Sequence, residues 1–171
     1  MMNDRVKLHG RFTIRCYECE GGRLLWEDAI DNMVVTVGKN FMLDKTLAGS
    51  SYTAAWYMGL ISSTSYSALA SGDIMSSHAG WLEAGSANNP TYTEGVRQTM
   101  AFSAAASGVK STSAPCAFTI DTGGTAKGAF ITTVATKDGT TGTLFAEGLF
   151  TGGDQVLSTG NVLQVTYSLT V

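Results

Sequence analysis

The segment Leu163-Gln164-Val165-Thr166-Tyr167-Ser168-Leu169-Thr170-Val171 decides the fold class of this chain. Its apolar and polar residues alternate without a break, which is the two-residue period of a β-strand with one face in a core and the other in water. An unpaired strand of this length would expose many free backbone groups. We therefore expect this segment to be paired inside a sheet or at an interface.

The N-terminal region repeats this alternation and predicts a β-hairpin. Apolar residues alternate with arginine and threonine over residues 6–16. The next stretch, Glu20–Arg23, contains two glycines and offers a tight turn, and the apolar run Leu24–Val35 follows it. We expect two antiparallel strands here, with a bulge at Asp31-Asn32.

The middle of the chain predicts one buried strand and one or two short helices. Asn40 can cap a helix that ends at Gly49, because asparagine favours the first position of a helix and glycine the position just after its end. The aromatic, apolar run Ala54–Ile61 predicts a buried strand. Residues Asp73–His78 can form one or two further helical turns, and the stretch Gly85–Pro90 predicts an exposed loop.

The C-terminal half is a series of short alternating segments separated by turn residues. Seven to nine strands with few helical residues indicate an antiparallel β-sandwich or jelly roll. We expect a single β-sandwich domain over residues 11–171, preceded by an N-terminal arm over residues 1–10. The apolar faces predicted for three of these strands are Val96, Gln98, Met100 and Phe102; Cys116, Phe118 and Ile120; and the β-branched run of residues 128–135.

Composition excludes several classes of function. The 171 residues suit one domain, and no cluster of Lys or Arg accompanies the net charge of −3, so we do not expect a nucleic-acid partner. Apolar runs are much shorter than the roughly 20 residues that span a bilayer, and no secretory signal is visible, so we expect no membrane partner and synthesis in a cytoplasm. Only 15% of residues are charged, which favours permanent protein–protein contact, including a homo-oligomer.

Three cysteines raise the question of a metal or redox site. Cys16 and Cys19 have CxxC spacing, and Cys116 stands alone. A zinc site needs further ligands, and a redox pair is expected at the start of a helix, whereas the pattern around Cys16 is that of a strand. We therefore interpret the cysteines as small hydrophobes in a reducing compartment and predict no metal site.

One histidine has acidic and hydroxyl neighbours in the sequence. Asp73 and Glu83 flank His78, and Ser76 and Ser77 precede it, so a Ser/His/Asp triad can be drawn. No GxSxG motif supports that reading. We interpret His78 as a structural residue, predict no catalytic residues and do not expect an enzyme.

Two glycine-rich segments and the three tryptophans are the remaining candidates for a binding site. Asp121–Gly124 and Thr151–Asp154 lack the ligand pattern of a calcium loop and the Gly-Lys-Ser/Thr of a phosphate loop, so we predict that both are hairpin turns and that no cofactor is bound. Trp26, Trp56 and Trp81 could form a platform for sugars, but their apolar neighbours favour packing in the core.

Several short motifs resemble those of tailed-bacteriophage virion proteins. They are Asn32-Met33-Val34-Val35-Thr36-Val37-Gly38, Trp56-Tyr57-Met58-Gly59-Leu60-Ile61, the stretch Asp73–Glu83, and Gly124-Thr125-Ala126-Lys127-Gly128-Ala129-Phe130. The similarity extends over residues 10–171. It is closest to head decoration proteins, also called capsid cement proteins.

This resemblance implies a structural role on the virion. Decoration proteins bind the outer capsid lattice and clamp neighbouring subunits, so the implied partner is the major capsid protein and the implied location is the capsid surface. The resemblance implies no catalytic residue. A phage tail component, either fibre or tube, and a carbohydrate-binding β-sandwich module are the alternatives that the sequence leaves open.

Overall fold

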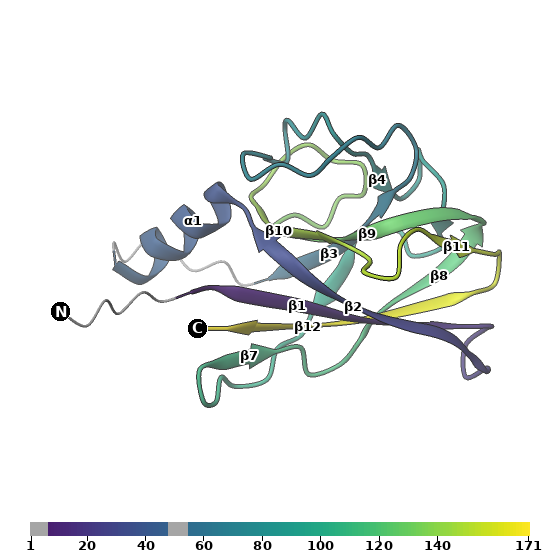
Figure 1. Ribbon diagram of the computed structural model, residues 1–171, viewed down its shortest axis with the longest axis horizontal. Coiled ribbons are helices and arrows are strands. Elements are labelled where there is room, and N and C mark those ends of the chain that lie inside the picture. The colour runs from purple at the N-terminus through teal and green to yellow at the C-terminus, as the bar shows by residue number, and fades with distance from the viewer. Residues whose placement is uncertain (1–6, 48–54) are drawn as a thin grey trace.

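A computed structural model of the protein describes residues 7–47 and 55–171 (Figure 1). This part of the chain is mainly β, with twelve strands and one helix. The elements are β1 (His9–Tyr17), β2 (Leu24–Val34), α1 (Thr36–Leu47), β3 (Trp56–Ser62), β4 (Glu83–Ala84), β5 (Thr91–Tyr92), β6 (Gln98–Met100), β7 (Val109–Ser111), β8 (Cys116–Thr122), β9 (Gly124–Thr132), β10 (Leu144–Leu149), β11 (Gln155–Leu157) and β12 (Val162–Thr170). The predicted fold class is confirmed.

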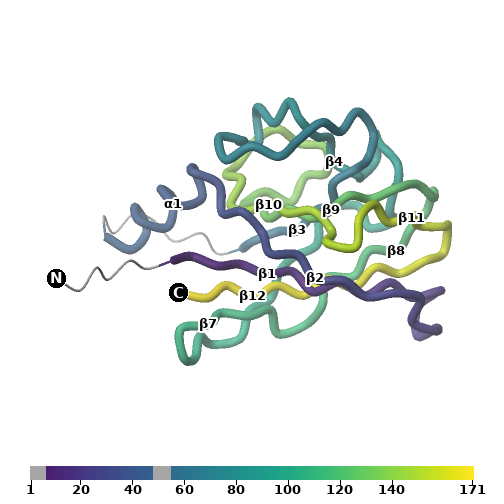
Figure 2. Tube along the Cα trace, viewed as in Figure 1, coloured from purple at the N-terminus to yellow at the C-terminus, as the bar shows by residue number. Residues whose placement is uncertain are grey.

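The strands form one antiparallel sheet that curls until it is nearly closed. Neighbours pair in the order β4-β3-β9-β10-β2-β1-β12-β8-β5, while β6 pairs with β3 and β7 with β12. Two contacts bring the β3 side and the β12 side together. A bridge joins Phe102 to Thr112, and the Cys116 thiol of β8 donates to the Thr99 carbonyl of β6 at 3.8 Å. The result is a barrel-like shape of the β-sandwich or jelly-roll type (Figure 2).

The segment that predicted the fold lies inside the sheet as β12. It pairs with β1 along its whole length, and with β8 and β7 on its other edge. The alternating apolar residues of β12 meet those of β1 in register, with Phe12 opposite Tyr167 and Ile14 opposite Val165. All four side chains are buried, so the predicted inward face and the predicted pairing are both confirmed.

The N-terminal hairpin is confirmed, but its bulge is elsewhere. β1 and β2 pair in register through Asp31 and Asn32, and the register shift falls between Cys16 and Tyr17. Gly10 explains why the ladder stays regular at Asn32, because a Cβ on Gly10 would lie 2.1 Å from the Asn32 Oδ1 atom. The missing side chain leaves space for the amide. β1 itself begins at His9, within the segment predicted as an arm, and residues 1–6 lie outside the described residues.

Helix α1 begins four residues before the predicted cap at Asn40. The Val35 carbonyl already accepts a hydrogen bond from the Lys39 amide at 3.0 Å. Gly38, which the prediction left outside the helix, packs within it against β10, where a Cβ would lie 2.3 Å from the Phe145 carbonyl oxygen. This close tertiary contact overrides the local cap signal. The predicted end at Gly49 lies outside the described residues.

The second predicted helix, over Asp73–His78, is wrong. These residues form turns with a single bridge between Ile74 and Ser77. The Asp73 carboxylate accepts hydrogen bonds from the Ala70 amide and from the Trp81 indole, both at 3.1 Å. Its side chain therefore folds the loop back on itself instead of capping a helix.

Neither glycine-rich segment forms a hairpin. The stretch Asp121–Gly124 passes directly from β8 to β9, two strands that do not pair with each other. The stretch Thr151–Asp154 separates β10 from β11, which both pair with β9, one after the other along its length. It is an excursion from the sheet, held by the Asp28 carboxylate of β2, which accepts from the Gly152 amide at 2.8 Å.

Long loops cover one side of the barrel. The chain between β3 and β6 and the chain between β9 and β10 lie together above β3, β9 and β10 (Figures 1 and 2). We call residues 63–97 and 133–143 the loop lobe. The inward face predicted for Val96, Gln98, Met100 and Phe102 is wrong at Val96. This residue is 49% exposed, whereas the neighbouring Arg97 is 0% exposed. Further along, Met100 is buried and Phe102 packs against the core, as predicted.

Candidate binding site

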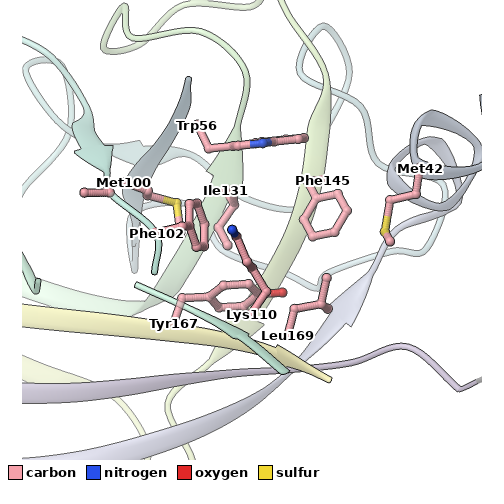
Figure 3. A pocket seen from close by; sticks show the side chains of 10 residues that line it. Met42, Trp56, Met100, Phe102, Lys110, Ile131, Phe145, Tyr167 and Leu169 are labelled. Atoms are coloured by element: carbon pink, nitrogen blue, oxygen red, sulfur yellow. The ribbon is translucent and has the colours of Figure 1, made fainter. Parts of the chain in front are cut away.

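A cavity of about 460 Å³ opens at the end of the barrel beside α1 (Figure 3). This volume is within the range of roughly 300–1,000 Å³ that small-molecule sites occupy. Most of its lining side chains are apolar or aromatic. They are Met42, Trp56, Met100, Ala101, Phe102, Lys110, Ile131, Phe145, Tyr167 and Leu169.

The cavity lies inside the curled sheet, at one of its open ends. β3, β6, β9, β10 and β12 each place an inward residue on it, and α1 adds Met42 from the side. Trp56 forms one aromatic wall, with its ring centroid 5.2 Å from that of Phe145 and 5.4 Å from that of Phe41. Mouths of β-barrels are common places for ligands, because the strands end there and leave the interior open.

Lys110 is the one charged residue among the described residues that line this cavity. It lies in β7 opposite Leu169 of β12, and its amine extends among the aromatic side chains (Figure 3). Its Nζ atom is 6.0 Å from the centroid of the Phe102 ring. No ion pair to Lys110 occurs within residues 7–47 and 55–171. The cavity thus holds a cation that has no counter-ion among the described residues.

Tyr167 lines the floor of the cavity, while its hydroxyl is buried away from solvent. Burial raises the pKa of its phenol far above the ordinary value near 10, and the Asn32 amide opposes part of that rise. The hydroxyl therefore stays protonated at neutral pH and adds no negative charge beside Lys110.

The loop lobe contains a different arrangement, a buried ion pair. Arg97 donates to both oxygens of Glu83, from Nε at 2.9 Å and from Nη2 at 2.7 Å, and its remaining donors reach the carbonyls of Val134 and Gly139 at 2.9 Å. The Asp138 amide donates to Glu83 as well, at 2.8 Å. Burial raises the pKa of Glu83, and the Arg97 guanidinium opposes that rise. Every strong contact of this pair is internal, so it fixes loops and offers nothing to a ligand.

A buried acid lies under the same lobe. Glu147 in β10 is fully buried, and burial together with the nearby Asp73 carboxylate raises the pKa of Glu147 to about 8. The Asp73 carboxylate is itself held by the Trp81 indole. Glu147 is therefore protonated at neutral pH and acts as a neutral core residue.

His78 packs as a structural residue. Its Nδ1 donates to the Trp81 carbonyl at 3.0 Å, and its ring stacks on the Trp81 ring at a centroid distance of 4.0 Å. Asp73 and Glu83 bond to Trp81 and Arg97 respectively, so none of the described hydrogen bonds joins His78 to an acid or a serine. The residues of the possible triad thus have separate partners.

The cysteines do not form a common site. Cys16 and Cys116 are buried, Cys19 is exposed, and all three are free. Burial raises the pKa of Cys16 to about 11 and that of Cys116 to about 12, which keeps both as thiols and makes them poor metal ligands and nucleophiles. In the described part of the chain, no three or more His, Cys, Asp or Glu side chains gather in a way that could hold a metal ion.

The three tryptophans lie in separate places. Trp81 is fully buried, as predicted, and Trp26 packs edge-on against Phe150 at 5.9 Å. Trp56 belongs to the cavity, which sequence reasoning missed. The apolar residues of this cavity fall on predicted strands, but Lys110 lies in a region of alanine and serine that carries no motif.

Comparison with known proteins identifies no relative of this chain from which a function could be inferred. No protein-family model matches the chain, and no curated protein matches its sequence. None of the helices in the described residues is long and apolar enough to cross a membrane.

Proposed function

We propose that this chain is a capsid decoration protein of a tailed bacteriophage. It binds the outer surface of the major capsid protein lattice and stabilises the junctions between subunits. The resemblance of the segments 32–38, 56–61, 73–83 and 124–130 to phage virion proteins supports this proposal. The low content of charged residues also supports it, because charged side chains are depleted at the cores of stable interfaces.

The observation that carries the proposal is an apolar face on α1 that the described residues leave largely uncovered. Leu43 is 56% exposed and Leu47 is 80% exposed. Residues four apart lie on the same side of a helix, so these two leucines form one surface. Burying a leucine side chain stabilises a contact by roughly 1.5–3 kcal/mol. This face therefore fits a permanent protein interface better than it fits water.

The position of α1 suits a contact surface. The helix lies at the same end of the molecule as β7 and the C-terminal residue Val171 (Figure 1), which is itself 62% exposed. Leu24 and Leu25 lie at the far end of the barrel, at the start of β2. The end of the barrel at α1 thus carries the two most exposed leucines and the exposed Val171, a surface on which copies of this chain could also meet.

The abundance of the chain in virions tests the location. Quantitative mass spectrometry of purified particles is expected to give a ratio to the major capsid protein that approaches that of the shell subunits. A much lower ratio would place the chain in the tail or at a vertex. Absence from the particles would overturn the proposal.

Paired substitutions test the surface. The variant Leu43→Gln/Leu47→Gln keeps good helix formers and removes the apolar face, so its binding to shells stripped of this chain is expected to fall at least about tenfold. The matched control is Leu24→Gln/Leu25→Gln, which changes two exposed leucines at the opposite end and is expected to bind like the wild type. Equal binding by all three proteins would exclude α1 as the contact.

A further inference from the structure

The cavity beside α1 has the build of a ligand site, independently of the proposed contact with a capsid. Small-molecule sites are concave and mostly apolar, with a few placed polar groups that fix the orientation of the ligand. Here aromatic and aliphatic side chains from five strands line the cavity, and a single ammonium group lies at its mouth. Such a lining favours a molecule with a long apolar body and few polar atoms.

The positive charge of Lys110 determines which charge a ligand of this cavity should carry. The Lys110 amine has the Phe102 ring 6.0 Å away and no carboxylate among the described cavity-lining residues. Lys110 is exposed to water at the mouth, and an anion bound there would form a charge-assisted hydrogen bond with its ammonium. A cationic ligand would be repelled, and a neutral one would leave the ammonium without a counter-ion. A single negative charge is therefore the best match.

The side chains around the opening of the cavity can accommodate a flexible alkyl chain. Met42 and Met100 stand at opposite sides of the opening (Figure 3), and methionine adapts its shape because it is unbranched and polarizable. Trp56 and Phe145 supply flat apolar walls between them. A polyphosphate or nucleotide would need several cations, and this cavity has one.

We propose that this cavity binds an amphipathic monocarboxylate of the medium-chain fatty acid type. Its carboxylate pairs with the Lys110 ammonium, and its alkyl chain lies against Trp56 and Phe145, between Met42 and Met100.

The first experiment uses decanoate as the probe, below its micelle concentration, with decanol as the uncharged comparison. Titration of the protein carrying ¹³C-methyl methionine is expected to shift the signals of Met42 and Met100. The signals of Met58 and Met75 serve as internal controls, because both residues are fully buried and neither lines the cavity. No shift at Met42 and Met100, or equal shifts of all four signals, would overturn the proposal.

The second experiment tests the charge. Lys110→Met keeps the length of the side chain and removes the ammonium, so calorimetry is expected to show decanoate affinity falling at least about tenfold while decanol affinity stays the same or rises. Lys39→Met is the matched control, since Lys39 is an exposed lysine of α1 outside the cavity. Unchanged decanoate binding by the Lys110 variant would overturn the assignment.

A third variant tests the space itself. Ala101 lines the opening and is exposed, so Ala101→Phe fills the mouth without entering the core, and binding of both probes is expected to be lost. Ala104→Phe adds the same ring at a nearby exposed position outside the lining and is expected to bind normally. Decanoate that binds the Ala101 variant as tightly as the wild type must bind elsewhere.

Discussion

The loop lobe and the barrel mouth each contain a cationic side chain, Arg97 and Lys110 respectively, and the two differ in whether the protein supplies partners for the charge. In the lobe, Arg97 is fully buried and bonds to Glu83 and to two carbonyl oxygens. At the mouth, Lys110 extends into an apolar cavity and has no ion pair with any described residue. The first cation holds loops together, and the second is free to meet a ligand.

This difference follows from the cost of removing charge from water. A buried ion is stable only where its partners replace hydration, and the planar guanidinium of Arg97 has enough donors to bond a carboxylate and two carbonyls at once. The amine of Lys110 keeps access to water through the open mouth, so it tolerates the lack of a partner. A cation whose hydrogen-bonding partners all come from the protein supports the fold, whereas a cation without such partners is a candidate for binding a ligand.

The largest expected effect is the loss of the lobe's ion pair. Arg97→Met leaves the Glu83 carboxylate buried without its partner, so the free energy of unfolding is expected to fall by about 3–5 kcal/mol in urea denaturation. Arg15→Met is the control, because Arg15 forms an exposed pair with Glu27 at 3.3 Å and is expected to change stability by less than about 1 kcal/mol. Similar losses in the two variants would contradict the contrast between buried and exposed pairs.

A comparable effect depends on pH and comes from Glu147. The pKa of Glu147 is raised from 4.5 to about 8, so the folded state keeps a proton that the unfolded chain releases above pH 4.5. The stabilisation is fully present below pH 4.5 and is lost as the pH rises through about 8, with roughly 3 kcal/mol lost by pH 7.

Glu147→Gln removes this titration while keeping the shape of the side chain. Unfolding measurements from pH 4.5 to 8 are expected to show the variant gaining stability relative to the wild type as the pH rises. A constant difference between the two proteins over that range would show that Glu147 titrates normally in the folded state.

The smallest expected effect is at the barrel mouth. Lys110 is exposed to water and makes no ion pair with the described residues, so Lys110→Met is expected to change the free energy of unfolding by less than about 0.5 kcal/mol. The same urea series that compares Arg97 and Arg15 measures this. A loss above about 2 kcal/mol would mean that Lys110 supports the fold, and the contrast between the two regions would fail.

Much of the cavity wall could be predicted from the sequence, but the cavity could not. Tyr167 and Leu169 belong to the apolar face of the final alternating segment, and Phe102 to that of an earlier one. Alternation shows that these residues face inward, yet it does not show whether the interior they face is filled. That depends on which strands become neighbours around the barrel.

The two cations show the same limit. The alternation of Val96, Gln98 and Met100 predicts that Arg97 faces outward, but Arg97 lies just before β6 and is fully buried. Its burial requires Glu83, Val134 and Gly139, which lie 14 to 42 residues away in sequence. Lys110 gave no local signal, because its strand has three residues and its surroundings come from other strands.

The sequence by itself determined the β character of the protein, the inward and outward faces of its long strands and its lack of concentrated charge, because side-chain period and composition are local properties. The tertiary structure alone decided the start of α1, the paths at the two glycine-rich segments, the buried ion pair and the open mouth. Each of these arises where distant segments compete for the same space or for the same hydrogen-bonding partners, and such competition is settled only when the sheet has curled and its neighbours are in place.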